Sequence, residues 1–403
     1  MLALRLTRGA HPLVLLRRLL VATASAGTGF LLLAALGHAA AHPATATDSF
    51  VRLLWCAVPV AATIQLAVSA ARTDPASRPQ RGMSAAGLGP VRLTLIAATS
   101  TAVSCALGSF FALLVFLALR GDLGGATATD SAGRLLGAGH PLPPAGTLLL
   151  LTVVPLLAAA ATAVVLRPRK NARGARHGAG AATGAGEPLT AMATNSTGSA
   201  MPAALPWGIT LTAAGLALET YVSRGAPESD ALLPLPERLI GSPPGVLAGW
   251  ALSTLGLVLA GPGLTQLSGR LLAAGRPGAV RLLAGRVLQE EARRIGRPLG
   301  VLCAVASGTY AAAKVYEAAP ARPFGPLAGL GGALVLACVT ASALTAALEA
   351  RWARTHTTAA LRRLGAPRSL LHRASALRIL ALLLVLGPLT WAIAELAALP
   401  LLH

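Results

Sequence analysis

Two glutamates, Glu219 and Glu395, are candidates for chemistry because each lies inside a long apolar stretch. A carboxylate in such surroundings can bind a substrate or relay a proton. Both glutamates lie near one end of their stretch, however, so a position where the carboxylate reaches water is the stronger interpretation. We retain them as weak candidates for substrate binding.

Other signs of chemistry are missing from the sequence. The phosphate-binding pattern GxxxxGK[ST] does not occur, and no Ser-His-Asp or paired-carboxylate arrangement is present. The four cysteines lie in apolar stretches without CxxC spacing, and the eight histidines form no metal-binding pair. We therefore expect a chain that is not an enzyme and that holds no catalytic residue, metal or cofactor. If ATP is used, a separate subunit must bind it.

The elements that would position the glutamates are membrane helices. Hydrophobic residues make up 54% of the chain and charged residues 12%, whereas a soluble domain has about 25% charged residues. The mean hydropathy is +0.66. We expect an all-α integral membrane protein with about nine transmembrane helices. The expected spans cover about 19–40, 51–71, 93–119, 147–166, 205–222, 246–267, 299–313, 326–348 and 379–399. A cleaved signal peptide is the alternative for the first.

The basic residues indicate how the chain lies in the membrane. The net charge is +20, and most of the 34 Lys and Arg fall in alternate connections between the expected spans. Because cytoplasmic loops of membrane proteins are enriched in Lys and Arg, this pattern predicts a cytoplasmic N-terminus in the inner (plasma) membrane. The positive charge is thus explained by topology, and we expect no nucleic-acid partner.

The most informative connection runs between the last two spans. Seven arginines lie between Arg351 and Arg378, and good helix formers precede Gly365 and Pro367. Gly and Pro end helices, so we expect a short helix at the inner face, a break, and a helix that enters the bilayer. A related pattern, Leu88-Gly89-Pro90-Val91-Arg92, precedes the third expected span. The chain therefore reads as two related units.

The stretch from Leu361 to Leu370 resembles the cytoplasmic loop of the FtsX-like (MacB-type) ABC transporter permeases, which leads into the third helix of a four-helix unit. The resemblance implies an ATPase subunit docked on the inner loops, membrane lipid around the helices, and pairing with a second permease, identical or related. The residues expected to couple to the ATPase in these two loops are Arg362, Arg363, Leu364, Gly365, Pro367, Arg368, Leu88, Gly89, Pro90 and Arg92.

A further inner segment, residues 269–298, is amphipathic. Apolar residues such as Leu283 and Leu288 recur at helical spacing, with charged residues on the other faces. Its core, Arg286 to Glu290, resembles the segment that precedes the second unit in the same permeases. This resemblance adds Gln289, Glu290, Arg293 and Arg294 to the coupling candidates, and the alternative is a plain helix on the membrane surface.

The resemblance also implies a division of the chain. The expected parts are a first four-helix unit (1–166), a flexible basic linker (167–204), a connecting helix pair (205–268), the interfacial helix (269–298) and a second unit that lacks its last helix (299–403). The expected function is that of a permease subunit that exports or extracts a hydrophobic or amphipathic substrate, or transmits force across the membrane. A degenerate permease acting as a scaffold, sensor or immunity protein is the main alternative, and a secondary transporter is a weaker one.

Overall fold

The structure is a computed structural model of the 403-residue chain. It describes residues 12–42, 46–73, 90–122, 136–137, 139–167, 204–225, 244–275, 278–318, 326–363, 365 and 367–402. All regular elements within these ranges are helices. They are α2 (Pro12–Ala41), α3 (Ala46–Trp55), α4 (Ala57–Thr73), α6 (Pro90–Arg120), α8 (Pro144–Leu166), α11 (Ala204–Gly225), α12 (Pro244–Ala273), α13 (Ala279–Ala318), α14 (Pro326–Ala353), α15 (Thr355–Arg363) and α16 (Arg368–Leu402).

Proline marks the start of many of these helices. It is the first residue of α2, α6, α8, α12 and α14. The first helical position suits proline because its fixed φ matches the helix and its missing N–H would be unpaired there in any case. The helix starts are therefore encoded locally, in the few residues that precede each apolar stretch.

Seven stretches of the described residues are long and apolar enough to cross a membrane. They are Val14–Ala41, Arg52–Arg72, Thr94–Arg120, Pro144–Leu166, Ala248–Ala273, Leu327–Ala353 and Arg368–Leu399. Many of their large apolar side chains, including Leu149 and Leu383, are exposed on the outside of the bundle. An apolar exterior on helices of this length is the surface that a bilayer requires. The chain is an all-helical, multi-span membrane protein.

The other two expected spans also form helices, but they are not among these seven. Residues 205–222 lie in α11, where Glu219 and several Gly and Thr residues lower the mean hydropathy. Residues 299–313 form the last part of α13, whose first part is strongly basic. Both helices pack on neighbouring helices, α11 along α12 at the outside of the bundle, and α13 against α12, α14 and α16.

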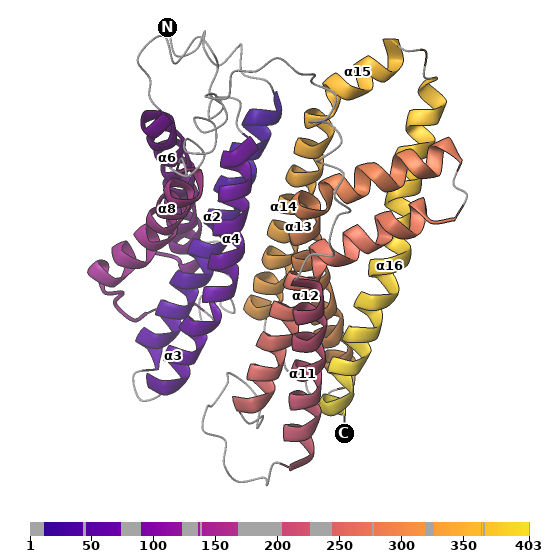
Figure 1. Ribbon diagram of the computed structural model, residues 1–403. Coiled ribbons are helices and arrows are strands. Elements are labelled where there is room, and N and C mark those ends of the chain that lie inside the picture. Colours follow the sequence, from indigo (N-terminus) through magenta and orange to yellow (C-terminus); the bar gives the residue numbers. More distant parts are fainter. Residues whose placement is uncertain are drawn as a thin grey trace, which may run out of the picture.

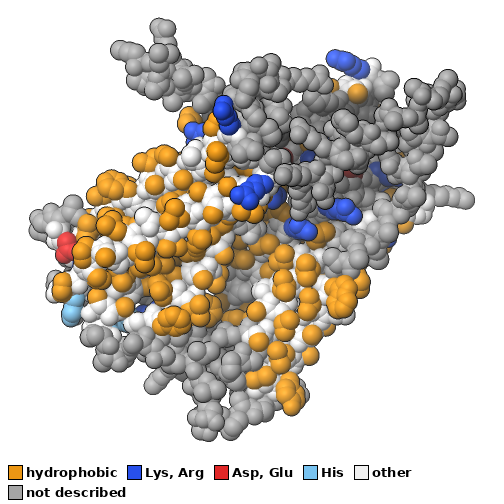
Figure 2. Space-filling view, turned by 60° about the vertical axis from the view of Figure 1, so that its left-hand side comes forward, with side chains coloured by type: hydrophobic (Ala, Val, Ile, Leu, Met, Phe, Trp, Pro, Cys, Tyr) orange, Lys and Arg blue, Asp and Glu red, His pale blue; other side chains and the backbone are white. Residues whose placement is uncertain are grey.

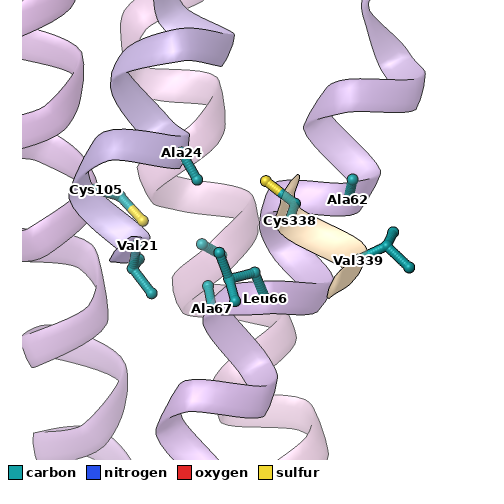
Figure 3. Packing of buried hydrophobic residues seen from close by; sticks show 9 residues of the cluster. Val21, Ala24, Ala62, Leu66, Ala67, Cys105, Cys338 and Val339 are labelled. Carbon is teal, nitrogen blue, oxygen red and sulfur yellow. The ribbon is translucent and has the colours of Figure 1, made fainter. Parts of the chain in front are cut away.

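The helices form two groups that meet through α14 (Figure 1). In the first group α2 packs against α4, α6 and α8, and in the second α13 packs against α12, α14 and α16. Helix α14 also packs on α4 and α2 of the first group. One buried cluster spans this junction, with Val21, Leu66, Cys105, Cys338 and Val339 among its members (Figure 3). The two groups thus share part of their core.

Charge is concentrated at one end of the bundle, which we call the basic end. Helices α2 and α16 begin there, and α15 lies across it (Figure 1). Its exposed arginines are Arg18, Arg72, Arg92, Arg167, Arg281, Arg286, Arg293, Arg294, Arg297, Arg351, Arg362, Arg363, Arg368 and Arg373. Figure 2 shows hydrophobic side chains covering the flank below, with Lys and Arg gathered toward that end. A bilayer would surround the flank and leave the basic end in water.

Candidate coupling site at the basic end

Helix α15 provides the most clearly formed element of the basic end. A single residue, Arg354, separates it from the end of α14. Its first turn is closed by the Thr358 N–H, which donates to the Arg354 carbonyl at 2.8 Å. The chain then turns at Gly365, whose φ of 90° favours glycine, and α16 begins at Arg368. The predicted sequence of short helix, break and long helix is confirmed.

The coupling candidates around α15 are exposed where they are described. Arg362 and Arg363 lie on the last turn of α15, and Gly365, Pro367 and Arg368 are exposed in the connection to α16. Leu364 lies outside the described residues. These side chains are therefore accessible to a partner that approaches the basic end.

A helical hairpin forms the second part of the basic end. The last turns of α12 and the first turns of α13 turn aside from the bundle axis and reach toward α16 (Figure 1). Each helix contains an internal proline, Pro262 in α12 and Pro298 in α13. Proline removes a backbone hydrogen bond and crowds the preceding turn, which bends a helix. The local sequence thus supplies a cause for the bend in each helix.

Glycines hold the two arms of this hairpin together. A Cβ atom added to Gly285 would lie 2.6 Å from the Gly269 carbonyl oxygen, and one added to Gly269 would lie 2.8 Å from the Gly285 carbonyl oxygen. Only glycine allows the backbones to approach this closely. The arms therefore act as one packed unit rather than as two independent segments.

The predicted amphipathic helix is present in the first half of α13. Leu288 is buried, while Glu290, Arg293 and Arg294 are exposed, and Gln289 is half-buried against Gly269. Leu282, another apolar residue of the same segment, is 46% exposed and so lies outside this buried face. The exposed side of this helix adds further basic charge beside α15.

Glu291 joins the two parts of the basic end. Its side chain is buried, and Oε1 lies 2.6 Å from Arg354 Nε while Oε2 lies 3.8 Å from Arg378 Nη1. Arg354 also donates through Nε to the Ala350 carbonyl at 3.0 Å. Because Arg354 separates α14 from α15 and Arg378 lies in α16, this ion-pair junction (Glu291, Arg354, Arg378) links the hairpin to three other helices.

The sequence interpretation placed Glu291 on a polar face, and this was wrong. Glu291 is 8% exposed because it faces the two arginines from neighbouring helices. Ala284, Leu288 and Glu291 follow one another at intervals of four and three residues on the buried face of α13. That spacing was a usable signal, since a glutamate in register with buried apolar residues needs a partner.

The surroundings of Glu291 alter its titration. Burial raises the pKa of its carboxyl to about 7, against the opposing influence of Arg354 and with a further rise from the neighbouring Glu290. Burial also lowers the pKa of Arg354, while Glu291 raises it. The junction therefore contains a carboxyl group that changes charge close to neutral pH.

We expect this titration to appear in the stability of the purified protein. Between the ordinary carboxyl pKa and about 7, the folded chain binds a proton at Glu291 that the unfolded chain does not bind. Stability from this group is therefore fully present at acid pH and is lost as the pH rises through about 7. Apparent melting temperatures of wild type and Glu291→Gln, measured in detergent from pH 5 to 8, test this. If the difference between the two is independent of pH, Glu291 does not titrate in this range.

The second predicted coupling segment is described only at its end. Pro90 begins α6 and Arg92 is exposed on its first turn, whereas Leu88 and Gly89 lie outside the described residues. A counterpart of α15 before α6 therefore stays a prediction.

The side chain of Glu219 is buried, whereas the sequence predicts that it reaches water. Its side chain is 0% exposed rather than in contact with water, because Gly215 and Gly249 bring α11 and α12 together around it. Trp250 donates through Nε1 to Oε1 at 2.5 Å, and Oε2 has no hydrogen-bond partner among the described residues. Glu395 is half-buried at the α13–α16 contact, where Tyr310 donates to it at 2.8 Å and Lys314 Nζ lies 3.9 Å away.

Neither glutamate lies in a cluster of metal-ligating groups. Where the structure describes the chain, no three His, Cys, Asp or Glu side chains come together as a metal site would require. Both glutamates are instead engaged by neighbouring helices, Glu219 by α12 and Glu395 by α13.

The fold and the basic end together define the class of this protein, a multi-span helical membrane protein with an ordered basic surface at one end of the bundle. Comparison of the chain with protein families, with curated proteins and with solved structures finds no match.

Proposed function

We propose that the chain is the membrane-spanning permease subunit of an ABC transporter of the FtsX-like kind, driven by a separate ATPase subunit. The observation that carries the proposal is the exposed element formed by α15, the turn at Gly365 and the start of α16. It coincides with the stretch whose sequence resembles the coupling loop of those permeases. A partner that docks there contacts an ordered helix bearing Arg362 and Arg363.

The ion-pair junction would transmit a displacement of α15 by the ATPase to the membrane helices. An ATPase that displaces α15 also displaces Arg354, which forms an ion pair with Glu291 of the hairpin, and Glu291 in turn lies close to Arg378 of α16. Charge-assisted hydrogen bonds and packed helices transmit displacement as rigid bodies, whereas a disordered loop absorbs it. ATP binding would thus move α13, α14 and α16 together.

The proposed topology has nine spans, with α11 and the last part of α13 added to the seven apolar stretches. Both helices are packed on spans throughout, and α11 is held to α12 by closely approaching small residues such as Gly208 and Gly215. The basic end is cytoplasmic in this proposal, since exposed arginines concentrate there. The proposal accordingly has the N-terminus in the cytoplasm and the protein in the plasma membrane.

The packing is compatible with two related units. Helix α2 contacts both α4 and α6 in the first group, and α13 contacts both α14 and α16 in the second. Helices α4 and α14 therefore hold corresponding places, as do α6 and α16. In this scheme the connecting pair α11 and α12 packs against α13 and α16 of the second unit.

The proposed substrate class rests on the exterior of the bundle and on the resemblance to FtsX-like permeases. Large apolar side chains are exposed along the flanks, so a hydrophobic or amphipathic molecule can reach the helices from the bilayer. The connection between α13 and α14 spans only residues 319–325, too few for a folded domain. Export or extraction of such a molecule, or force transmission to a partner on the far side of the membrane, is compatible with these features.

Co-purification tests the docking surface. We expect an ATPase to co-purify with the detergent-solubilised wild-type chain from its own cells and to be lost from Arg362→Glu/Arg363→Glu. Reversing two exposed charges at a docking surface weakens association without disturbing the packed core. The matched control is Arg362→Lys/Arg363→Lys, which keeps the charge and should retain the ATPase.

Two results would count against the proposal. If no ATPase is found in a wild-type preparation that is folded and monodisperse, the proposed function as a transporter subunit is wrong, and a membrane scaffold or sensor takes its place. Equal recovery of an ATPase with the Glu and the wild-type chains would move the docking surface away from α15.

A further inference from the structure

A pocket opens between α2, α4 and α6 at the basic end, apart from α15 and the hairpin. Its cavity volume is about 40 Å³, room for a small polar group, and it is open to the surface on one side. Three alanines of α4 form one wall, and Ala97, Ser100, Thr101 and Ser104 of α6 form the other. Small side chains on both walls leave the space that larger ones would fill. The pocket is therefore a consequence of the sequence of α4 and α6.

Two adjacent arginines of α2 complete the lining. Arg17 is 6% exposed, and its guanidinium lies over the ring of Trp352 in α14, 4.9 Å from the ring centre. Arg18 is exposed at the rim. The residues that line the pocket include no Asp or Glu. The lining therefore combines positive charge, hydroxyl groups and methyl groups, which is the chemistry that recognises an anion with an apolar part.

The hydroxyl groups of the lining indicate which further group the ligand carries. Thr101 donates to the Ala97 carbonyl at 2.9 Å, and Ser104 donates to the Ser100 carbonyl at 3.0 Å. Since their protons are used within α6, these oxygens can accept a hydrogen bond from a ligand. The arginines can only donate. A ligand that fits both has an anionic group beside a hydroxyl or ammonium donor.

The surroundings of the pocket indicate what the rest of the ligand is. Leu15, Leu16 and Leu19 of α2, together with Leu95 and Ile96 of α6, are exposed next to the lining residues in sequence. These side chains lie where the basic end meets the apolar flank. A water-soluble anion would gain nothing from them, whereas acyl chains would lie along them.

We propose that this pocket binds the phosphodiester of an anionic phospholipid from the leaflet at the basic end. Arg17 and Arg18 bind the phosphate, Thr101 and Ser104 accept from a hydroxyl-bearing head group such as that of phosphatidylglycerol, and the acyl chains lie along the exposed leucines. The lipid contacts α2, α4 and α6 together, next to the Arg17–Trp352 contact with α14. This proposal does not depend on a transporter function.

Lipid titration of the delipidated full-length chain, followed by native mass spectrometry in detergent, tests the site. The probes are phosphatidylglycerol, phosphatidylcholine and inorganic phosphate. We expect wild type to bind phosphatidylglycerol in preference to phosphatidylcholine, and inorganic phosphate not to displace it at millimolar concentration. Arg18→Gln, which removes an exposed arginine of the lining, should weaken phosphatidylglycerol binding about tenfold, as expected for one charge-assisted contact.

Two further variants distinguish lipid binding in the pocket from nonspecific attraction to the basic end. Arg72→Gln removes an exposed arginine at the end of α4 that does not line the pocket, and it should bind as wild type does. Ala97→Leu should fill the pocket from α6 and reduce binding while leaving the net charge unchanged. Equal binding by wild type, Arg18→Gln and Ala97→Leu would overturn the proposal. So would equal affinity for the two lipids, or displacement of lipid by inorganic phosphate, which would assign a free anion.

Discussion

At pH 8, where the Glu291 carboxyl is ionised, Glu291→Ala is expected to lower the free energy of unfolding by about 2–3 kcal/mol. Removing one partner of a fully buried ion pair costs about 3–5 kcal/mol because a charge remains buried without its partner. The expected cost is lower here because part of the Arg354 side chain is exposed. The change leaves both Arg354 and Arg378 without the carboxylate that they share.

The apparent melting temperature in detergent measures this loss, and Glu290→Ala is its matched control. Glu290 is the preceding residue on the same helix but is exposed, so its removal should change stability by less than about 0.5 kcal/mol. Combining Glu291→Ala with Arg354→Ala should cost less than the sum of the single changes if the two residues interact directly. Equal melting temperatures for the Glu290 and Glu291 variants would show that the junction does not hold the basic end together.

Gly300→Leu is expected to be at least as damaging, since it affects the crossing of α12 and α13. A Cβ at this position lies 2.8 Å from the Leu257 carbonyl oxygen and 3.1 Å from Val258 Cα, both backbone atoms that cannot move aside without separating the helices. Overpacking against a rigid neighbour costs about 1–3 kcal/mol, and a leucine against backbone belongs at the upper end of that range. We expect loss of the monodisperse peak in size-exclusion chromatography.

Gly308→Leu provides the control on the same helix. No atom lies within 4 Å of a Cβ built at Gly308, which is exposed on the flank, so a leucine there would simply meet the surrounding detergent or lipid. Helix propensity should even favour the change by a few tenths of a kcal/mol or more. If both variants elute and melt alike, the close approach of α12 and α13 is not a requirement of the fold.

The buried carboxyl of Glu219 shows how packing changes the meaning of a sequence signal. Its position near the end of an apolar stretch predicts contact with water, yet the closely packed backbones of α11 and α12 remove that access. The indole of Trp250 then supplies the hydrogen bond that water would have made. The location of Glu219 in the sequence was visible, but the helix that covers it was not.

The sequence by itself determined the class of the protein and the local structure of its best-defined loop. Hydropathy over about 20 residues sets each apolar span, because every backbone polar group in a bilayer must be bonded within its own helix. The start of α6, α8, α12 and α14 at proline, and the break at Gly365 between α15 and α16, are likewise local properties of a few consecutive residues.

Only the tertiary structure decided which residues meet across the chain. The contact of α14 with α4, the partners of Glu291 in α14 and α16, and the pocket between α2, α4 and α6 join residues far apart in the sequence. Helical periodicity defines a buried face but not the helix that will cover it, since many apolar and small-residue faces are interchangeable in composition. Close packing between glycines and the pairing of buried charges determine which helix covers that face. Both depend on two helices together.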